Sequence, residues 1–489
     1  MDQNISFETV KTLRTLLDTG EITASQLLDH TLSEISHTNP TLNSFVLVTE
    51  SLARAQAESA DARIEQGKPS SPIDGIPIAV KDLYDTAGIV TAGGTAAFKK
   101  RIPNHDSYVV DKLQRAGALI VGKTNTHELA LGGTTNNPHY GPTRNPWNLE
   151  SVPGGSSGGS GAALASGQVP LALGTDTGGS VRIPSAFCGV TGHKPTYGLI
   201  GKTGIIPLSK TLDHAGPMAR TAFDCALLLN QMNGRDINDP HNINFDFSTD
   251  FTENIEKDVK GITLAIIPSL LVDTELGVTQ SFTKSIAILE QMGVNITEIE
   301  PTTNNLLNIK DDRRYDPEIS WGDPLPSIIR NLSPILLSEG STYIENILRN
   351  EPHLIGQAVR DRMMKGIDIS VHDYIRALDW RKEIESRFES CLLNSTIDGY
   401  VVPTSPQVAE PIASDPHVGI EPAVKFRNTS VFNHTRQPSI SVPNGFNSEG
   451  LPTGLMITTA QKNDALALRI AHQYQLNTNF HLSRPSMNG

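Results

Sequence analysis

Residues 154–180 read GGSSGGSGAALASGQVPLALGTDTGGS, and this stretch carries the strongest signals of fold and function in the chain. Two Gly-Gly-Ser elements, which end at Ser156 and Ser180, enclose a run of small apolar residues. Serine is a weak nucleophile at its own pKa, so a hydrolase that uses one must supply a base. Glycines beside a serine permit backbone conformations that other residues resist, and they let bare N–H groups point at one place. We therefore predict a serine site whose oxyanion donors are backbone amides.

The same stretch indicates the fold, because it predicts a helix at residues 158–166 followed by a strand at residues 169–175. The spacing of apolar residues continues this alternation on both sides. Further strands are predicted at residues 76–82, 118–124 and 262–268, near residue 296, and in three runs between residues 398 and 460. Further helices are predicted at residues 7–17, 23–35, 107–115, 279–292 and 465–474. Such alternation implies an α/β fold with a large mixed, mainly parallel β-sheet covered by helices on both faces.

We expect one large domain over residues 1–489, without a linker or an internal repeat. Its parts are N-terminal helices at about residues 1–60, a core at about 60–230, and a helical cap or insertion at about 305–395. Two helix starts are predicted from their capping residues. Thr23 and Gln26 form a capping-box pattern, and Asp106 is expected to cap the helix that follows it.

Composition excludes several classes of protein. Hydrophobic residues make up 38% of the chain and charged residues 19%, and the formal net charge is −13. A general nucleic-acid binder needs a basic face, so none is expected here. Three cysteines make no disulfide framework, and the N-terminus lacks the apolar core of a signal peptide. No apolar run approaches the length of a membrane span, and we expect a cytoplasmic protein that does not bind membranes.

Lys81 is the candidate base. It ends the apolar run IPIAVKD, where the bland alternative is a surface lysine at a strand end. A lysine accepts a proton only when it is neutral. Holding one with an unperturbed pKa neutral at pH 7 costs about 4.6 kcal/mol unless burial lowers the pKa. The end of a strand beneath a glycine-rich loop is a place where such burial is feasible.

Competing interpretations of the glycine-rich stretch fit the sequence less well. A flexible Gly/Ser linker would not continue into ALASGQVPLALG. A nucleotide P-loop needs Gly-Lys-Ser/Thr, which does not follow. The stretch also satisfies Gly-x-Ser-x-Gly, which would make Ser157 the nucleophile of an α/β-hydrolase, but that elbow must follow a strand directly. The preceding RNPWNLESVP contains turn residues and two prolines instead.

Two further candidates elsewhere are also weak. His127 and Glu128 begin like a zinc helix, but the position for a second histidine holds Leu131, so no metal is expected. Cys188 lies near the serines in sequence but has no identified base, and a buried packing role is favoured.

The lysine in IPIAVKD, the loop GGSSGG and the element GTDTGGSVRIPSAFCGVTGHKPTYG together resemble the amidase signature family. The resemblance extends over about residues 60–225, with weaker matches at VVPTSP and SISVPNGF. It implies the amidase signature fold and a cofactor-free serine amidohydrolase, that is, a hydrolase of carbon–nitrogen bonds in linear amides.

The resemblance also implies roles for individual residues. Ser180 would be the nucleophile, Ser156 would relay its proton after a cis peptide bond, and Lys81 would be the base. The oxyanion would be held by the backbone N–H groups of Thr177, Gly178, Gly179 and Ser180.

Other residues are expected to support this site or to line its pocket. Ser157, Asp176 and Arg182 would brace the loop, the last two through main-chain hydrogen bonds or an ion pair. Substrate-binding residues expected by analogy or by position are Ala130, Leu131, Gly132, Gly133 and Arg436. The last of these either reaches the pocket and holds a carboxylate or carbonyl, or is a solvated turn residue.

The expected substrate is a small amide, with aryl amides and carbamates included, acted on by a monomer or homodimer. The alternative is the glutaminase A subunit of a glutamyl-tRNA(Gln)/aspartyl-tRNA(Asn) amidotransferase, whose signature is similar to YGPTRNPWNLESVPGGSSGGS. Departures from that protein lie in residues 305–395 and at Arg436, where it is expected to have glycine. The polar-aromatic cluster in this insertion is either a helix surface or part of a cap that sets leaving-group preference. It consists of Arg313, Arg314, Tyr315 and Trp321.

Overall fold

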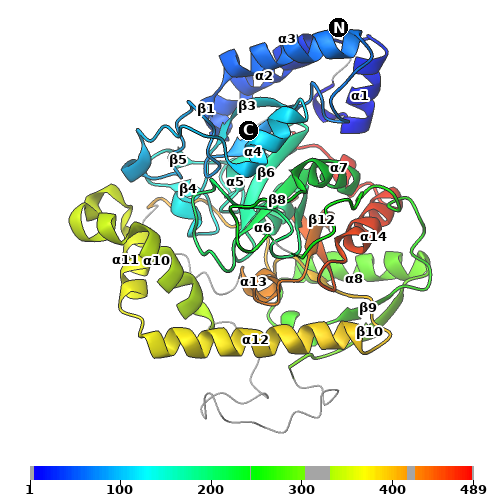
Figure 1. Cartoon of the computed structure of the whole chain (residues 1–489). Helices are drawn as coiled ribbons and strands as arrows, with labels where there is room; N and C mark the ends of the chain where they lie inside the picture. Colours follow the sequence, from blue (N-terminus) through cyan, green and yellow to red (C-terminus); the bar gives the residue numbers. More distant parts are fainter. Residues whose placement is uncertain (1–4, 243, 303–330, 416–424, 487–489) are drawn as a thin grey trace.

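The computed structural model describes residues 5–242, 244–302, 331–415 and 425–486. Its centre is a sheet of eleven strands in the order β1-β3-β2-β6-β8-β7-β12-β13-β11-β9-β10, with helices around it (Figure 1). The sheet is mixed, as the alternation predicts. Strands β3, β2 and β6 run parallel to one another, as do β11, β9 and β10, while the pairs between β6 and β11 in this order are antiparallel.

The strands of this sheet are β1 (Phe45–Val48), β2 (Pro77–Lys81), β3 (Leu119–Thr124), β6 (Leu171–Asp176), β7 (Thr191–Lys194), β8 (His214–Ala219), β9 (Thr263–Ile266), β10 (Asn295–Glu298), β11 (Gly399–Pro403), β12 (Ser439–Phe446) and β13 (Pro452–Thr459). Strands β4 (Asn136–Asn137) and β5 (Gly141–Pro142) form a separate pair. The described α-helices are α1 (Val10–Asp18), α2 (Ala24–Leu42), α3 (Glu50–Glu65), α4 (Tyr108–Arg115), α5 (Gly158–Ala165), α6 (Arg182–Cys188), α7 (Ala222–Met232), α8 (Leu276–Gln291), α10 (Ser333–Asn350), α11 (Gln357–Ile367), α12 (Val371–Leu393), α13 (Arg427–His434) and α14 (Asp464–Leu476).

Most predicted elements are confirmed within a few residues, and the exceptions lie at the N-terminus and at one cap. Thr23 caps α2 with a complete capping box through Gln26, as its pattern predicts. The Asp106 cap is wrong: the side chain of Ser107 accepts the hydrogen bond from the helix N–H. The carboxylate of Asp106 instead accepts from the backbone N–H of Ala87 and from Gln114, because it lies one residue too early to reach the first turn. Several elements were not predicted: strands β1, β7 and β8 and helices α6, α7 and α13.

Helices bury the strands from both faces, which explains their continuous apolar runs. Every residue of β2, β6 and β11 is buried. Helix α6 packs against β12 and β13, and α8 and α14 contact the same two strands. Figure 1 shows α2 and α3 side by side at the top, next to the N-terminus, and α12 as a long helix along the bottom. None of the described helices is long and apolar enough to cross a membrane.

The described part of residues 305–395 is helical and packs on loops from the core. Helices α10 and α11 share an apolar cluster with Leu129 and Leu208, and α12 places Phe388 against Tyr400. Helices α10 and α11 therefore cover loops of the core, while α12 packs on strand β11 of the sheet. The cluster of Arg313, Arg314, Tyr315 and Trp321 lies outside the described residues.

Candidate active site

The candidate site lies where two neighbouring parallel strands end. Strand β2 ends at Lys81 and pairs in parallel with β6, which ends at Asp176. The carboxyl ends of parallel strands meet at one edge of a sheet, and open α/β folds usually bind ligands there. The loop that carries Ser156 and Ser157 precedes α5, so the serines of the first Gly-Gly-Ser element reach the same edge.

Lys81 lies inside the protein, which contradicts the alternative that it is a surface lysine at a strand end. Its side chain is fully buried, with no exposed surface. The Nζ atom lies 2.8 Å from each of three hydroxyl oxygens, those of Ser156, Ser157 and Thr175. The Lys81 amine, at the end of β2, therefore hydrogen-bonds to both serines of the loop.

Burial changes the proton affinity of this amine. Desolvation lowers the pKa of Lys81 to about 7, against the opposing attraction of the Asp176 and Asp213 carboxylates. Hydroxyl groups surround the amine, and no carboxylate forms a direct ion pair with it among the described residues. Lys81 can therefore be neutral, and act as a base, near neutral pH.

The two hydroxyls next to Lys81 have different surroundings. The Ser157 hydroxyl also donates to the Thr175 carbonyl and accepts from the Thr175 N–H, both at 3.3 Å. The Ser156 hydroxyl bonds only to Lys81 among the described residues, so it keeps capacity for another partner. The Gly155-Ser156 peptide bond is cis.

Ser180 lies on the loop between β6 and α6 and is joined to the first serine loop through the backbone. The Ser157 N–H donates to the Ser180 carbonyl at 3.2 Å. Within the described residues, the Ser180 hydroxyl forms no hydrogen bond to Ser156. Gly179 precedes Ser180 with a φ of 137°, a conformation that only glycine adopts readily. Glycine at this position is therefore a requirement of the turn that presents Ser180.

The oxyanion donors are not all free. The Gly179 N–H donates to Asp176 Oδ1 at 2.8 Å, so in this conformation it is not available to a substrate, contrary to its expected role. The N–H groups of Thr177, Gly178 and Ser180 have no hydrogen-bond partner in the part of the chain that the structure describes. These three can still hold an oxyanion.

Asp176 and Arg182 brace this loop through an ion pair and through main-chain bonds. Arg182 Nη2 and Nε contact the two Asp176 carboxylate oxygens at 2.9 and 3.0 Å, and both side chains are fully buried. Burial opposes ionisation of Asp176, but the Arg182 guanidinium and the Asn433 amide hold its pKa well below the usual range. The carboxylate also accepts from the Val181 N–H at 3.1 Å. It therefore fixes the backbone on both sides of Ser180.

Helix α13 supplies two residues that were not predicted. Asn433 donates to Asp176 Oδ1 at 2.8 Å and accepts from Arg182 at 2.7 Å. Thr429 donates to the Gly178 carbonyl at 2.6 Å. These residues are more than 240 positions from the loop, and no local pattern in the sequence signals the contact.

Asp213 was also missed. It accepts a hydrogen bond of 2.6 Å from the Thr177 hydroxyl and others from the backbone N–H groups of Leu208 and Ser209. Burial raises the pKa of Asp213 to about 6 against these hydrogen bonds. The carboxylate thus ties residues 208–213 to the start of the loop of residues 177–181, named the oxyanion loop for its expected role.

A cavity of about 290 Å³ opens beside the loop. Thr175 and Thr177 line it next to the site, and Leu83, Ile206 and Leu208 are among its apolar wall residues. Lys202, Lys210 and His241 line it as well.

The residues expected to line the pocket are distributed unevenly. Ala130 lines the cavity, and it and Leu129 have left-handed backbones, with φ of 60° and 50°. Such strain in non-glycine residues is common at functional sites. Leu131 accepts a hydrogen bond from Arg362 at its carbonyl, and Gly133 lies against Phe426 and Lys425, where a side chain would clash.

Two other expected pocket residues lie away from the cavity wall. Gly132 lies against the ring of His127. The Arg436 guanidinium lies over the Tyr197 ring at 4.8 Å and 3.8 Å from Glu385, and its side chain is 31% exposed. It is therefore partly solvated, and it is not among the residues that line the cavity. Tyr197 separates it from His214, which does line the cavity.

The surroundings of the two weaker candidates, Cys188 and His127, favour structural roles. Cys188 is buried, and desolvation raises the pKa of its thiol, which disfavours a thiolate. Burial lowers the pKa of His127 to about 3, with Arg362 and Lys425 acting in the same direction. Over the described ranges, no group of three or more His, Cys, Asp or Glu residues is arranged to hold a metal ion.

Comparisons with known proteins agree with this geometry. A family model described as Amidase matches residues 26–468. The chain therefore belongs to the amidase signature family. It is 36% identical, over 98% of both chains, to the A subunit of the glutamyl-tRNA(Gln) amidotransferase of Chloroflexus aurantiacus.

Solved structures similar to this chain come from more than one kind of protein. The A subunit of the glutamyl-tRNA(Gln) amidotransferase of Thermotoga maritima is 29% identical with a TM-score of 0.78, and the match covers 100% of both chains. A chain from a vestigial complex, linked to the origins of an s-triazine catabolic enzyme, is 28% identical with a TM-score of 0.85. That match covers 96% of this chain and 98% of the other.

Proposed function

We propose that this protein hydrolyses the carbon–nitrogen bond of a linear amide, with Ser180 as nucleophile, Ser156 as proton relay and Lys81 as base. The observation that carries the proposal is the fully buried Lys81 amine, 2.8 Å from Ser156 Oγ, beside the loop that ends at Ser180. Ser156 rather than Ser157 is the relay because the Ser157 hydroxyl is already engaged by Thr175.

The proposed reaction has two halves. Neutral Lys81 accepts the Ser156 proton as Ser156 takes the proton of Ser180, whose oxygen attacks the carbonyl carbon. The free N–H groups of Thr177, Gly178 and Ser180 stabilise the oxyanion. The tetrahedral intermediate collapses, the C–N bond breaks, and the proton returns through Ser156 to the leaving nitrogen. Water then attacks the acyl-enzyme, loses a proton to the same relay and releases the carboxylic acid and Ser180.

Substitution of the individual serines tests this assignment. With a chromogenic aryl amide and mass spectrometry of the intact protein, Ser180→Ala is expected to abolish both turnover and acyl-enzyme. Ser157→Ala is the matched control, and it should retain measurable activity because Ser157 supports the amine without relaying a proton. Full activity in Ser180→Ala, or an acyl group on Ser157, would remove the triad assignment.

Two substrate classes remain for this site, free small amides and glutamine within an amidotransferase. The named relatives favour the second class, since the similarity at 36% identity covers 98% of both chains. Arg436 supports the first class, because it departs from the glycine expected in the A subunit. Its guanidinium packs on Tyr197, which in turn contacts the cavity-lining His214.

Assays of the purified chain separate the two classes. A free amidase is expected to turn over aryl amides or carbamates without any other protein. An amidotransferase subunit is expected to release ammonia from glutamine only when its partner proteins are added. Aryl-amide turnover by the isolated chain therefore supports the first class, and partner-dependent glutaminase activity supports the second.

A further inference from the structure

The lining of the cavity beside the oxyanion loop is chemically mixed. Thr175, whose hydroxyl contacts Lys81, and Thr177, in the loop that carries Ser180, both line it. Leu83, Ile206 and Leu208 contribute apolar wall surface. A substrate bound at the serine can therefore extend one arm along an apolar surface.

Cationic side chains line the same cavity from residues 202–210. Lys202 is half-buried, and its ammonium lies 4.2 Å from the centre of the Tyr197 ring. The hydrogen bond that this ammonium donates to the Lys210 carbonyl is long, at 3.3 Å. The Lys210 ammonium has no hydrogen-bond or ion-pair partner among the described residues. Both ammonium groups thus retain donors for a ligand.

The carboxylates that line the cavity are already occupied. Asp213 accepts from the Thr177 hydroxyl and from two backbone N–H groups. Asp239 accepts from the backbone N–H groups of Lys202 and His241. These acids therefore hold the loops together, and their oxygens are used by those N–H groups. Burial lowers the pKa of His241, so its ring is neutral at pH 7 and does not repel the lysines.

We propose that this cavity binds a carboxylate at the end of one apolar arm of the amide substrate, with Lys202 as its principal partner and Lys210 as the second. The inference rests on the proposed amide hydrolysis and specifies its substrate class, amides that carry a second, acidic group. Burial lowers the pKa of Lys202 against the attraction of Asp239 and Asp213. An anionic ligand would replace the solvation that this amine lacks.

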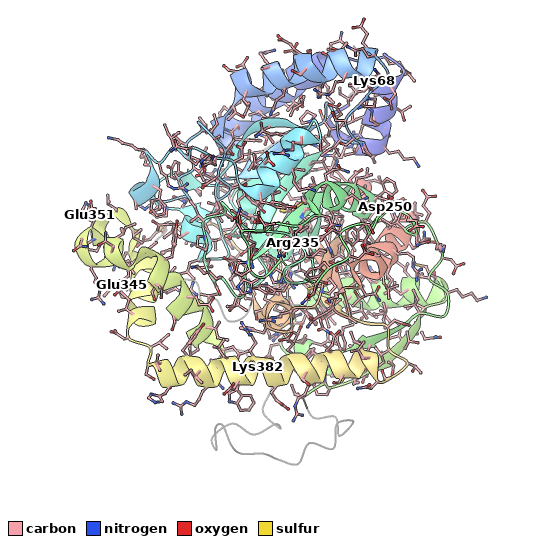
Figure 2. The ribbon with its side chains drawn as sticks, viewed as in Figure 1. Lys68, Arg235, Asp250, Glu345, Glu351 and Lys382 are labelled. Carbon is pink, nitrogen blue, oxygen red and sulfur yellow. The ribbon has the colours of Figure 1, made fainter. Side chains whose placement is uncertain are left out.

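Residues 238–241 also line the cavity. Arg235, three residues earlier in the chain, lies near the middle of the face shown in Figure 2. The volume of about 290 Å³ is close to the lower limit of typical small-molecule sites.

Two matched pairs of amides test the proposal on either side of the scissile bond. The first pair is glutaric acid mono-4-nitroanilide and its methyl ester, and the second is 4-acetamidobenzoate and its methyl ester. The wild-type kcat/KM ratio of acid to ester is expected to exceed one in at least one pair. Lys202→Met should lower that ratio by about tenfold, the loss expected for one charge-assisted hydrogen bond, and Lys202→Arg should restore it.

Lys68→Met is the control, since it removes the same charge from an exposed position far along the chain, at the top of Figure 2. Its acid-to-ester ratio should equal that of the wild type. An unchanged ratio in Lys202→Met, or a wild-type preference for both esters, would overturn the carboxylate subsite.

Calorimetry separates this inference from the proposed function. Glutarate and 4-acetamidobenzoate are titrated into Ser180→Ala, where no turnover is needed. Binding that Lys202→Met weakens about tenfold supports the subsite even if no amide is hydrolysed. Amide hydrolysis without Lys202-dependent binding of either acid leaves the function in place and contradicts the subsite.

Discussion

A lysine acts as a base at neutral pH only where the protein makes its charged form costly, and Lys81 is such a residue. Its amine is fully buried and its pKa is lowered to about 7 by desolvation. The residue type and strand position were predicted from IPIAVKD. The degree of burial was not, because it depends on side chains from residues 156–175 that close over the amine.

The activity should depend on the protonation state of Lys81 and therefore on pH. Only neutral Lys81 accepts a proton, so kcat/KM for an uncharged amide should rise with pH through about 7 and then level off. A pH–rate profile between about pH 5 and 9 measures this. Asp213, with a pKa raised to about 6, is another nearby group that titrates in this range. Asp213→Asn should keep this limb but shift it to lower pH, because the attraction of the Asp213 carboxylate raises the pKa of Lys81. A rate that falls as the pH rises would contradict the role of Lys81.

At the scale of elements, helix α13 and the oxyanion loop form one unit. Asn433 contacts both members of the Asp176–Arg182 pair, and Thr429 holds the Gly178 carbonyl. The side chains of Asn433, Thr429, Asp176 and Arg182 are buried, so a lost partner leaves a buried polar atom without a hydrogen bond. The positions of Ser180 and of its neighbouring N–H groups therefore depend on a helix from the far end of the chain.

Asn433→Ala tests this dependence. Because the substitution leaves Asp176 and Arg182 short of buried partners, it should lower the free energy of unfolding by about 1–3 kcal/mol, measured by urea denaturation. It should also lower kcat, since the loop loses a brace. Asn254→Ala, at an exposed position, is the control and should change neither quantity appreciably. A variant as stable and active as the wild type would show that the loop is held without α13.

At the scale of the whole molecule, one continuous sheet carries the site. Strands β2 and β6 supply Lys81 and Asp176, and the helices that pack on both faces keep water from these strands. Helices α10 and α11 pack on Leu83, which follows β2, and on Leu129 and Leu208, while α12 packs on β11. Figure 2 shows Glu345 and Glu351 at the left side of the molecule and Lys382 along the bottom, so this segment carries a charged outer face.

The central strands should dominate global stability. Ile440, with 0% exposure on β12, lies within the main core, so Ile440→Ala should cost about 2–5 kcal/mol in unfolding free energy. The matched substitution Ile237→Ala, at 82% exposure, should cost less than about 0.5 kcal/mol. Urea or thermal unfolding of both variants measures the difference. Equal effects would mean that the sheet interior does not limit unfolding.

Local sequence determined most of the alternating strands and helices, the lysine at the end of β2 and the two glycine-serine loops, although strands β7 and β8 and helices α6, α7 and α13 were missed. These features follow from apolar spacing and from glycine-dependent turns, which act over a few residues. The capping box at Thr23 is of the same kind, and the misplaced cap at Asp106 shows its limit, because one residue of register decides which side chain reaches the helix N–H.

Tertiary structure alone decided which groups share the site. Burial in the packed chain lowered the pKa of Lys81. The Ser157 hydroxyl bonds to Thr175, whereas the Ser156 hydroxyl bonds to Lys81 alone among the described residues. The Gly179 N–H donates to Asp176. Tertiary structure also brought in Asn433 and formed the cavity lined by Lys202. Burial and hydrogen bonding between segments hundreds of residues apart are properties of the packed chain, and no local pattern of residues encodes them.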